Sequence, residues 1–279
     1  MQFWKMNGAG NDFIILNNLQ EGLSADCFPA LARRLCERRL SIGADGLMVV
    51  ERPQSGGDYR MLFYNSDGSA GEMCGNGARC ICRYGYEIGL AGELQRVETT
   101  AGLVTGRRIT RRQYKIELNR PTTLRLDYPV EVDGKTYPCS YVELGDPGLP
   151  HAVVPIPGLR GRPEAELFAL GRKLRAHPAF PKGADVSFFD VEGPGRIWER
   201  TFERGVEGFT YACGTGTGSV AAVLTLQGAV SGRAVAVQMT GGELVVDVER
   251  RGSTVEHLFL TGPTNLVAKG ELTDEELPL

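Results

Sequence analysis

Cys74-Gly75-Asn76-Gly77 is followed, 139 residues later, by Cys213-Gly214-Thr215-Gly216. Other segments return at nearly the same distance: Gly43-Ala44-Asp45 recurs as Gly183-Ala184-Asp185, 140 residues further along the chain. Solenoid repeats are only some tens of residues long, so a period near 140 indicates that a whole domain is duplicated. The fold is therefore expected to consist of two similar halves, each with one cysteine in the same glycine-rich turn.

The duplication also predicts where the halves meet. The last matching segments are Pro121-Thr122 and Pro263-Thr264. We predict an N-terminal half made of residues 1–122 plus 264–279, which contains Cys74, and a C-terminal half of residues 123–263, which contains Cys213. A chain of 279 residues is long enough for two domains of ordinary size, each with its own core.

The pattern within each half mixes helices and strands. Apolar residues around Leu31 and Leu35 follow a helical period, whereas residues 97–100 and 244–248 alternate as strands do. Residues 220–224, which follow the second cysteine motif, are apolar on every side, as is typical of a helix buried all round. We predict an α/β (α+β) fold in which each half wraps its strands around a central helix.

Composition excludes several classes of protein. With 42% hydrophobic residues, 23% charged residues and a net charge of −3, the chain is typical of a soluble globular protein without a basic surface for nucleic acid. No apolar run has the length of a signal peptide or a membrane span, so a cytoplasmic protein is expected. Seven cysteines are an odd number, and Cys74, Cys80 and Cys82 lack the paired spacing of a zinc site. Neither a disulfide framework nor a metal site is predicted.

The repeated turns suggest acid–base chemistry on an amino acid. A glycine turn before a helix presents backbone N–H groups that can hold a carboxylate, and the positive end of the helix dipole favours an ionised cysteine there. If the halves are related by a pseudo-twofold axis, Cys74 and Cys213 lie on opposite faces of one substrate Cα. One sulfur can then remove a proton while the other returns one, which inverts the centre.

Two less specific interpretations apply to these turns. Free cysteines often pack as small apolar residues, and this is the expectation for the other five. Gly214, Gly216 and Gly218 could form a dinucleotide-binding loop, but no strand-loop-helix unit with an acidic residue at the required distance follows. No cofactor is therefore predicted.

Five motifs, in order along the whole chain, resemble the signatures of the diaminopimelate epimerase family. They are Lys5-Met6-Asn7-Gly8-Ala9-Gly10-Asn11-Asp12-Phe13, Asn65-Ser66-Asp67-Gly68-Ser69, Cys74-Gly75-Asn76-Gly77-Ala78-Arg79-Cys80, Glu203-Arg204-Gly205 and Ala212-Cys213-Gly214-Thr215-Gly216. The resemblance implies two domains in pseudo-twofold relation, each a β-barrel-like sheet around a central helix. It also implies a homodimer that needs no pyridoxal phosphate and converts L,L-diaminopimelate to the meso form, in lysine and cell-wall precursor biosynthesis.

The same resemblance implies roles for individual residues. Cys74 corresponds to the proton donor and Cys213 to the acceptor in the L,L to meso direction. His151 and Glu203 correspond to residues that tune the pKa values of the two thiols. The carboxylate at the reacting centre would be held by Gly75, Asn76, Gly214 and Thr215, and further substrate contacts would come from Asn11, Asn65, Asp185, Glu203 and Arg204, with Arg204 on the distal carboxylate.

Two residues depart from the family pattern at the distal end of the substrate. Leu149 and Asp185 stand where the family commonly has asparagines. An aspartate there favours an ammonium group over a carboxylate. A two-cysteine racemase of another amino acid, for example a basic one such as histidine, is therefore an alternative. A non-catalytic redox protein, in which Cys74 and Cys213 form a disulfide, is the alternative from another class.

Overall fold

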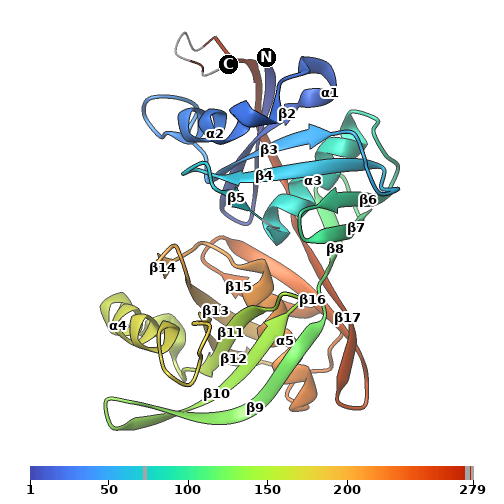
Figure 1. The fold of residues 1–279 in the computed structure, drawn as a ribbon. Helices are drawn as coiled ribbons and strands as arrows, with labels where there is room; N and C mark the ends of the chain where they lie inside the picture. The colour runs from blue at the N-terminus through green and yellow to red at the C-terminus, as the bar shows by residue number, and fades with distance from the viewer. Residues whose placement is uncertain (72–73, 274–276, 278–279) are drawn as a thin grey trace. The chain divides into compact units, whose positions relative to one another are not determined.

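The fold is known from a computed structural model that describes residues 1–71, 74–273 and 277. The chain divides into two compact units, Met1–Ile116 with Gly262–Leu279, and Glu117–Thr261 (Figure 1). The first boundary falls after Ile116, six residues before the predicted boundary after residue 122. The second falls after Thr261, two residues before the predicted boundary after residue 263. Each unit is described separately below as unit 1 and unit 2.

Unit 1 is built mostly of strands. The strands are β1 (Gln2–Gly8), β2 (Asn11–Asn17), β3 (Gly46–Glu51), β4 (Tyr59–Asn65), β5 (Ala70–Gly71), β6 (Leu94–Thr99), β7 (Gly102–Arg108), β8 (Gln113–Leu118), whose end lies in unit 2, and β18 (Asn265–Glu271). The helices are α1 (Asn18–Glu21), the short 3-10 helix η1 (Ala25–Cys27), α2 (Phe28–Cys36) and α3 (Gly75–Glu87). The strands pair in the order β18-β1-β2-β3-β4-β6-β7-β8, and β5 pairs with β4.

Unit 2 repeats this arrangement. Its strands are β9 (Pro121–Val132), β10 (Lys135–Leu144), β11 (Leu149–Pro155), β12 (Asp185–Gly193), β13 (Arg196–Glu203), β14 (Gly208–Phe209), β15 (Val235–Met239), β16 (Gly242–Arg251) and β17 (Thr254–Pro263). Its helices are the short η2 (Leu159–Gly161), α4 (Glu164–Arg175) and α5 (Gly214–Leu226). The pairing order is β9-β10-β11-β12-β13-β15-β16-β17, with β14 on β13.

The parallel pairs fall at equivalent places in the two units. In unit 1, β2 pairs in parallel with β3 and β4 with β6; in unit 2, β11 pairs in parallel with β12 and β13 with β15. Parallel neighbours need a crossover connection, which is usually helical. The second crossover of each unit carries the helix that follows the cysteine motif, α3 or α5. The mixed α/β class is confirmed, and both units have the same topology, as a duplicated chain requires.

Helix α5 lies in the core of unit 2. It packs against β10, β11, β12 and β16, and residues 220–224 are all buried, as their apolar character predicted. Its backbone approaches the neighbouring strands closely at Gly218, where an added Cβ would lie 2.8 Å from the Leu118 side chain. A larger residue there would displace the helix that begins at Cys213.

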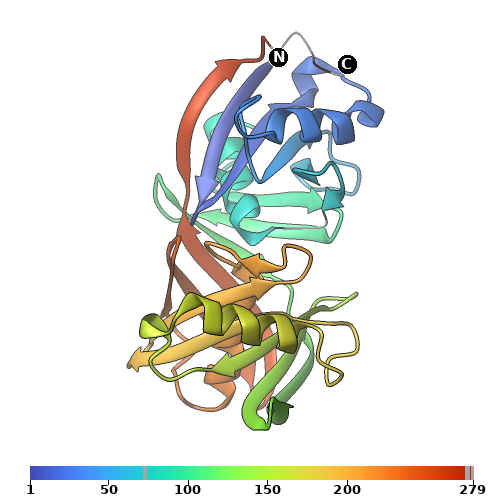
Figure 2. The same cartoon turned by 90° about the vertical axis from the view of Figure 1, so that its left-hand side faces the viewer.

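The outer helices differ from α5 because only one face is apolar. Helix α4, the yellow-green helix that lies against the strands of unit 2 in Figure 2, buries Leu167, Gly171 and Leu174. Its two glutamates, Arg172 and Lys173 are exposed. Pro163 is the residue that immediately precedes α4. Within the described ranges, no helix is long and apolar enough to span a membrane.

Candidate active site

Cys213 is the residue that begins helix α5. Its backbone is extended (φ −116°, ψ 109°), so the side chain can turn back over the first helical turn. There Sγ accepts a hydrogen bond from the Gly216 N–H at 3.4 Å and lies 3.5 Å from the Thr215 hydroxyl oxygen. The first helical bond within this turn runs from the Thr217 N–H to the Cys213 carbonyl. The N–H groups of Gly214 and Thr215 precede it and have no acceptor within the helix, which leaves them available to an anion.

The expectation that the helix N-terminus lowers the pKa of this cysteine is wrong for Cys213 in this structure. Its pKa lies well above the usual value because burial disfavours the thiolate, and the charges of Glu203 and Asp185 add to the effect. The bonds from Thr215 and Gly216 act in the opposite direction but are outweighed. Cys213 is consequently a thiol at neutral pH, ready to act as an acid. To act as a base it must first lose its proton.

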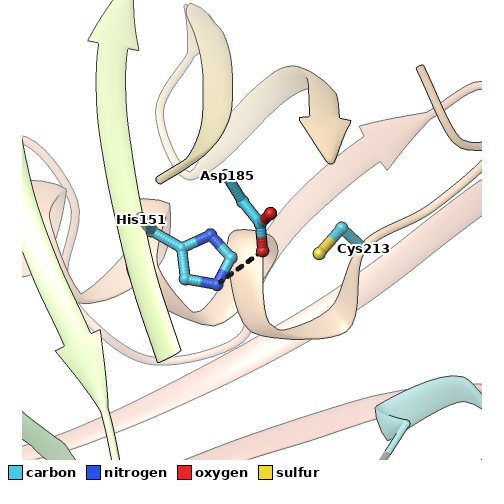
Figure 3. Close-up of side chains that lie close together, drawn as sticks. All are labelled: His151, Asp185 and Cys213. Atoms are coloured by element: carbon cyan, nitrogen blue, oxygen red, sulfur yellow. Dashed lines mark ion pairs between the residues drawn. The ribbon is translucent and has the colours of Figure 1, made fainter. Parts of the chain in front are cut away.

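His151 and Asp185 lie beside Cys213, as the close-up in Figure 3 shows. They occupy paired positions on the parallel strands β11 and β12, and His151 Nε2 lies 3.8 Å from Asp185 Oδ2. Burial lowers the pKa of His151, more than the nearby Asp185 carboxylate raises it, so the imidazole is neutral at neutral pH. Folding thus brings together three predicted site residues that are separated by at least 28 positions in the sequence.

Glu203 ends strand β13 and Arg204 follows it. The Glu203 carboxylate accepts a hydrogen bond from the Thr210 hydroxyl at 2.5 Å, and its charge is one cause of the raised pKa of Cys213. The Arg204 N–H donates to Asp185 Oδ1 at 2.6 Å, and its guanidinium donates to the carbonyl of Lys182 at 2.8 Å. Arg204 therefore holds the Asp185 carboxylate in place through its backbone, while its side chain remains exposed.

The equivalent site in unit 1 begins with Cys74, in an extended conformation at the start of α3 (φ −127°, ψ 119°). The next turn contains Asn76, whose side-chain amide donates to Asn11 Oδ1 at 2.7 Å and whose Oδ1 accepts from buried Arg79 at 2.8 Å. Asn11 in turn donates to Asp45 at 3.0 Å. Two predicted substrate contacts, Asn11 and Asn76, thus belong to one hydrogen-bonded chain. Arg79 and Asp45, which the motifs contain but to which the sequence assigned no role, complete it.

The remaining predicted residues occupy two different settings. Asn65 is exposed at the end of β4, where its side chain donates to the Ser69 hydroxyl at 3.0 Å. Gly75 and Gly214 are the buried first residues of α3 and α5. Leu149, one of the two departures from the family pattern, begins β11 two positions before His151. Asp185 is the other departure, and its carboxylate lies beside the Cys213 sulfur.

The sequence-based prediction missed Glu199, a fully buried carboxyl group beneath the start of α5. Its Oε2 lies 2.8 Å from the Thr217 hydroxyl, and Thr201 donates to Oε1 at 3.1 Å. Burial raises the pKa of Glu199 to about 7. Strand alternation could have located it, because β13 turns Ile197, Glu199 and Thr201 toward the same buried face.

Comparison with known proteins agrees with this geometry. The family model for diaminopimelate epimerase matches residues 3–115 and 145–267. Diaminopimelate epimerase from Aquifex aeolicus is 36% identical, with 99% of both chains covered. The enzyme of that name from Moorella thermoacetica is 38% identical over 97% of this chain and 99% of its own.

Two solved structures share the fold at low sequence identity. A probable proline racemase from Agrobacterium radiobacter has a TM-score of 0.70 at 18% identity, covering 99% of this chain and 94% of its own. A hydroxyproline epimerase from Agrobacterium vitis has a TM-score of 0.71 at 16% identity, covering 98% and 90%. The family match and the curated relatives span nearly the whole sequence, and both cysteine motifs lie inside the matched residues. The chain belongs to the diaminopimelate epimerase family.

Proposed function

We propose that this protein converts L,L-diaminopimelate to the meso form by proton transfer between one substrate Cα and two cysteines, without pyridoxal phosphate. The observation that carries the proposal is the repeated helix start: Cys74 and Cys213 occupy the same position before α3 and α5, in units of the same topology. A duplicated acid–base group is what inversion of a carbon centre requires, because the proton leaves one face and returns to the other.

In this mechanism each sulfur exchanges a proton with one face of the substrate Cα. In the L,L to meso direction the Cys213 thiolate takes the Cα proton and the Cys74 thiol delivers its own proton to the opposite face. The roles are exchanged in the reverse direction. Each turnover moves one proton onto one sulfur and one proton off the other, so the two thiols must exchange protons with solvent before the same direction is repeated.

The carbanion needs stabilisation because an amino-acid Cα is a very weak acid. We assign this task to the N–H groups at the two helix starts, those of Gly75 and Asn76 in unit 1 and of Gly214 and Thr215 in unit 2. Preorganised donors of this kind stabilise the charge that develops on the carboxylate in the transition state. Their fixed positions in the first turn of a buried helix support the assignment.

Burial and nearby charges together raise the proton affinity of Cys213. Burial has the largest effect on the pKa of the thiol and Glu203 and Asp185 raise it further, so a positive charge must arrive before Cys213 becomes a base. We propose that the substrate ammonium group supplies that charge. His151 is neutral and contributes shape and hydrogen-bonding capacity rather than charge, and Arg204, with its exposed side chain, is assigned to the distal carboxylate.

The test is isotope exchange. Reduced protein, incubated in deuterated water with L,L-diaminopimelate and a metal chelator but no pyridoxal phosphate, is expected to place deuterium at one Cα and to form the meso isomer. Exchange with histidine or lysine but not with diaminopimelate would instead favour the racemase of a basic amino acid, for which the buried Asp185 carboxylate is the supporting observation. Absence of exchange with every amino acid, together with a disulfide that forms reversibly between Cys74 and Cys213, would favour the redox protein.

Three further properties belong to the same proposal. We expect the protein to act in the cytoplasm, where its thiols stay reduced. It is expected to be a homodimer, as the family resemblance implies. Residues 1–122 with 264–279 and residues 123–263 are proposed as the two epimerase halves. Size-exclusion chromatography with light scattering measures the oligomeric state directly.

A further inference from the structure

Three metal-binding side chains of unit 2 converge at one point. One ligand atom each from His151, Asp185 and Cys213 lies within 4.8 Å of the other two (Figure 3). The three side chains come from two neighbouring strands and from the residue that begins α5, so the rigid core of unit 2 fixes their positions. All three residues are buried.

His151 supplies a second and independent observation. Its side chain is completely buried, and neither ring nitrogen has a hydrogen-bond partner among the described residues. The contact between Nε2 and Asp185 Oδ2, at 3.8 Å, is too long to be a hydrogen bond. A buried polar group without a partner is costly, and such groups often mark the place of a missing ligand. Here the unpartnered nitrogen points toward the other two ligand atoms (Figure 3).

The other two ligands are held from behind by backbone donors. The Arg204 N–H binds Asp185 Oδ1 at 2.6 Å, which leaves Oδ2 directed at His151. The Gly216 N–H binds Cys213 Sγ at 3.4 Å. Hydrogen bonds to the ligands orient the first coordination shell of metal sites in proteins, and their loss typically lowers metal affinity about 10- to 100-fold.

We propose that His151, Asp185 and Cys213 form a binding site for Zn²⁺. Nitrogen, oxygen and thiolate ligands together suit this borderline-soft ion, whereas Mg²⁺ and Ca²⁺ prefer oxygen alone. Ligand distances of about 2.0–2.3 Å in a tetrahedron place ligand atoms roughly 3.3–3.7 Å apart. The His151–Asp185 distance is already close to this, and small side-chain rotations bring Cys213 into range. Binding releases the thiol proton to solvent as the zinc–sulfur bond forms, and the fourth position stays open.

The site has a consequence that rests on the proposed function. A zinc ion on Cys213 occupies the lone pair that would take the substrate proton, so Zn²⁺ is an inhibitor and not a cofactor. Asp185 is the anionic oxygen ligand of the set, and the asparagine that the sequence resemblance implies for this position would be a weaker, uncharged ligand. Inhibition by zinc is therefore expected to depend on Asp185.

Direct metal binding tests the site without any measurement of activity. Reduced, metal-free, full-length protein is titrated with Co²⁺, whose tetrahedral thiolate complex absorbs visible and near-ultraviolet light, and then with Zn²⁺, which displaces it. One equivalent is expected to bind. Asp185→Asn and Cys213→Ser are each expected to weaken binding by about tenfold or more. Cys27→Ser, which alters a partly exposed cysteine of unit 1, is the matched control and should bind as the unchanged protein does.

Cys74→Ser tests whether the metal binds in unit 2 rather than at the equivalent cysteine of unit 1. This variant is expected to keep its metal binding, because all three proposed ligands lie in unit 2. Equal loss of binding in Cys74→Ser and Cys213→Ser would overturn the proposal, as would the absence of stoichiometric binding or full binding by Asp185→Asn. If a variant unfolds, the unchanged protein still tests the site. Bound Zn²⁺ must slow the alkylation of Cys213, measured by mass spectrometry, and removal of the metal with EDTA must restore the original alkylation rate. Binding without any epimerase activity would leave the metal site intact and refute the proposed function instead.

Discussion

The carboxyl group of Glu199 lies 2.8 Å from the hydroxyl oxygen of Thr217, one turn into the helix that Cys213 begins. The same hydroxyl oxygen lies 2.8 Å from the carbonyl oxygen of Cys213. The Thr217 hydroxyl donates toward both acceptors, as a three-centre hydrogen bond at a helix start allows. Burial raises the pKa of Glu199 to about 7. The start of α5 therefore contains a titratable group that is not assigned to substrate.

Glu199 is expected to make folding stability depend on pH. Its pKa is about 7 in the folded protein and 4.5 in a model compound, so its contribution to stability is fully present below pH 4.5 and is lost as the pH rises to 7. The loss amounts to roughly 3 kcal/mol. Urea unfolding at pH 4.5 and pH 8 should show that Glu199→Gln, which cannot ionise, loses less stability than the unchanged protein. An equal loss of unfolding free energy between pH 4.5 and pH 8 in the two proteins would contradict the raised pKa of Glu199.

Replacement of either cysteine is expected to stop epimerisation. Cys74→Ala and Cys213→Ala each leave one acid–base group, which can exchange a proton on one face but cannot invert the centre. A loss of at least about 100-fold in kcat is expected, since a positioned acid or base contributes this much or more. Conversion of L,L-diaminopimelate to the meso isomer, followed by chiral chromatography, measures it. Cys36→Ala, at a buried cysteine outside both motifs, is the control. Substantial inversion by either motif variant would refute the two-base mechanism.

The carboxylates near Cys213 are expected to add to the rise in its thiol pKa that burial causes. Glu203 and Asp185 both raise it, so Glu203→Gln and Asp185→Asn should each lower the pH at which the thiol ionises. The rate of iodoacetamide alkylation at Cys213, followed by mass spectrometry across a pH series, reports this midpoint. Glu192→Gln removes an equal charge from a surface ion pair with Arg160 and should leave the midpoint unchanged. A shift in the opposite direction would show that another group governs the thiol.

The first turn of α5 has no room for a side chain at Gly216. A Cβ added there would lie 2.6 Å from the Ser187 hydroxyl, 2.9 Å from the Thr201 hydroxyl and 3.1 Å from Glu199 Oε1. Gly216→Ala is therefore expected to destabilise the protein by about 1–3 kcal/mol and to displace Cys213. Gly193→Ala is the matched control, because an added Cβ there meets no atom within 4 Å. The melting temperatures of the two variants are compared by thermal unfolding. Equal values would show that the start of α5 can shift to accommodate the added methyl group.

Much of the fold could be predicted because its signals are local. The constant offset between the cysteine motifs indicated a repeated unit, and the apolar stretch of residues 220–224 indicated a buried helix, which α5 is. Glycine in the first turn likewise indicated a helix start that can approach its neighbours closely. Residue periodicity and turn composition depend on near neighbours in the sequence, so they can be read without the tertiary structure.

The electrostatics of the site could not be predicted in this way. The motif predicted a lowered pKa for Cys213, but its surroundings in the folded unit reverse the direction. Glu199 was missed because a glutamate in a strand is usually exposed. Alternation places it on one face of β13 with Ile197 and Thr201, but burial of that face follows from the packing of unit 2. Burial and charge at a point depend on residues that are distant in the sequence.

By itself, the sequence determined that the protein is duplicated, that each half is mixed α/β, and that Cys74 and Cys213 begin helices within glycine turns. Only the tertiary structure decided that His151 and Asp185 pair across parallel strands and face Cys213, and that a buried carboxyl group lies beneath the same helix start. The physical reason is the reach of the forces involved. Backbone conformation responds to adjacent residues, whereas the proton affinity of a buried thiol responds to every charge and every solvent-excluding group that folding packs around it.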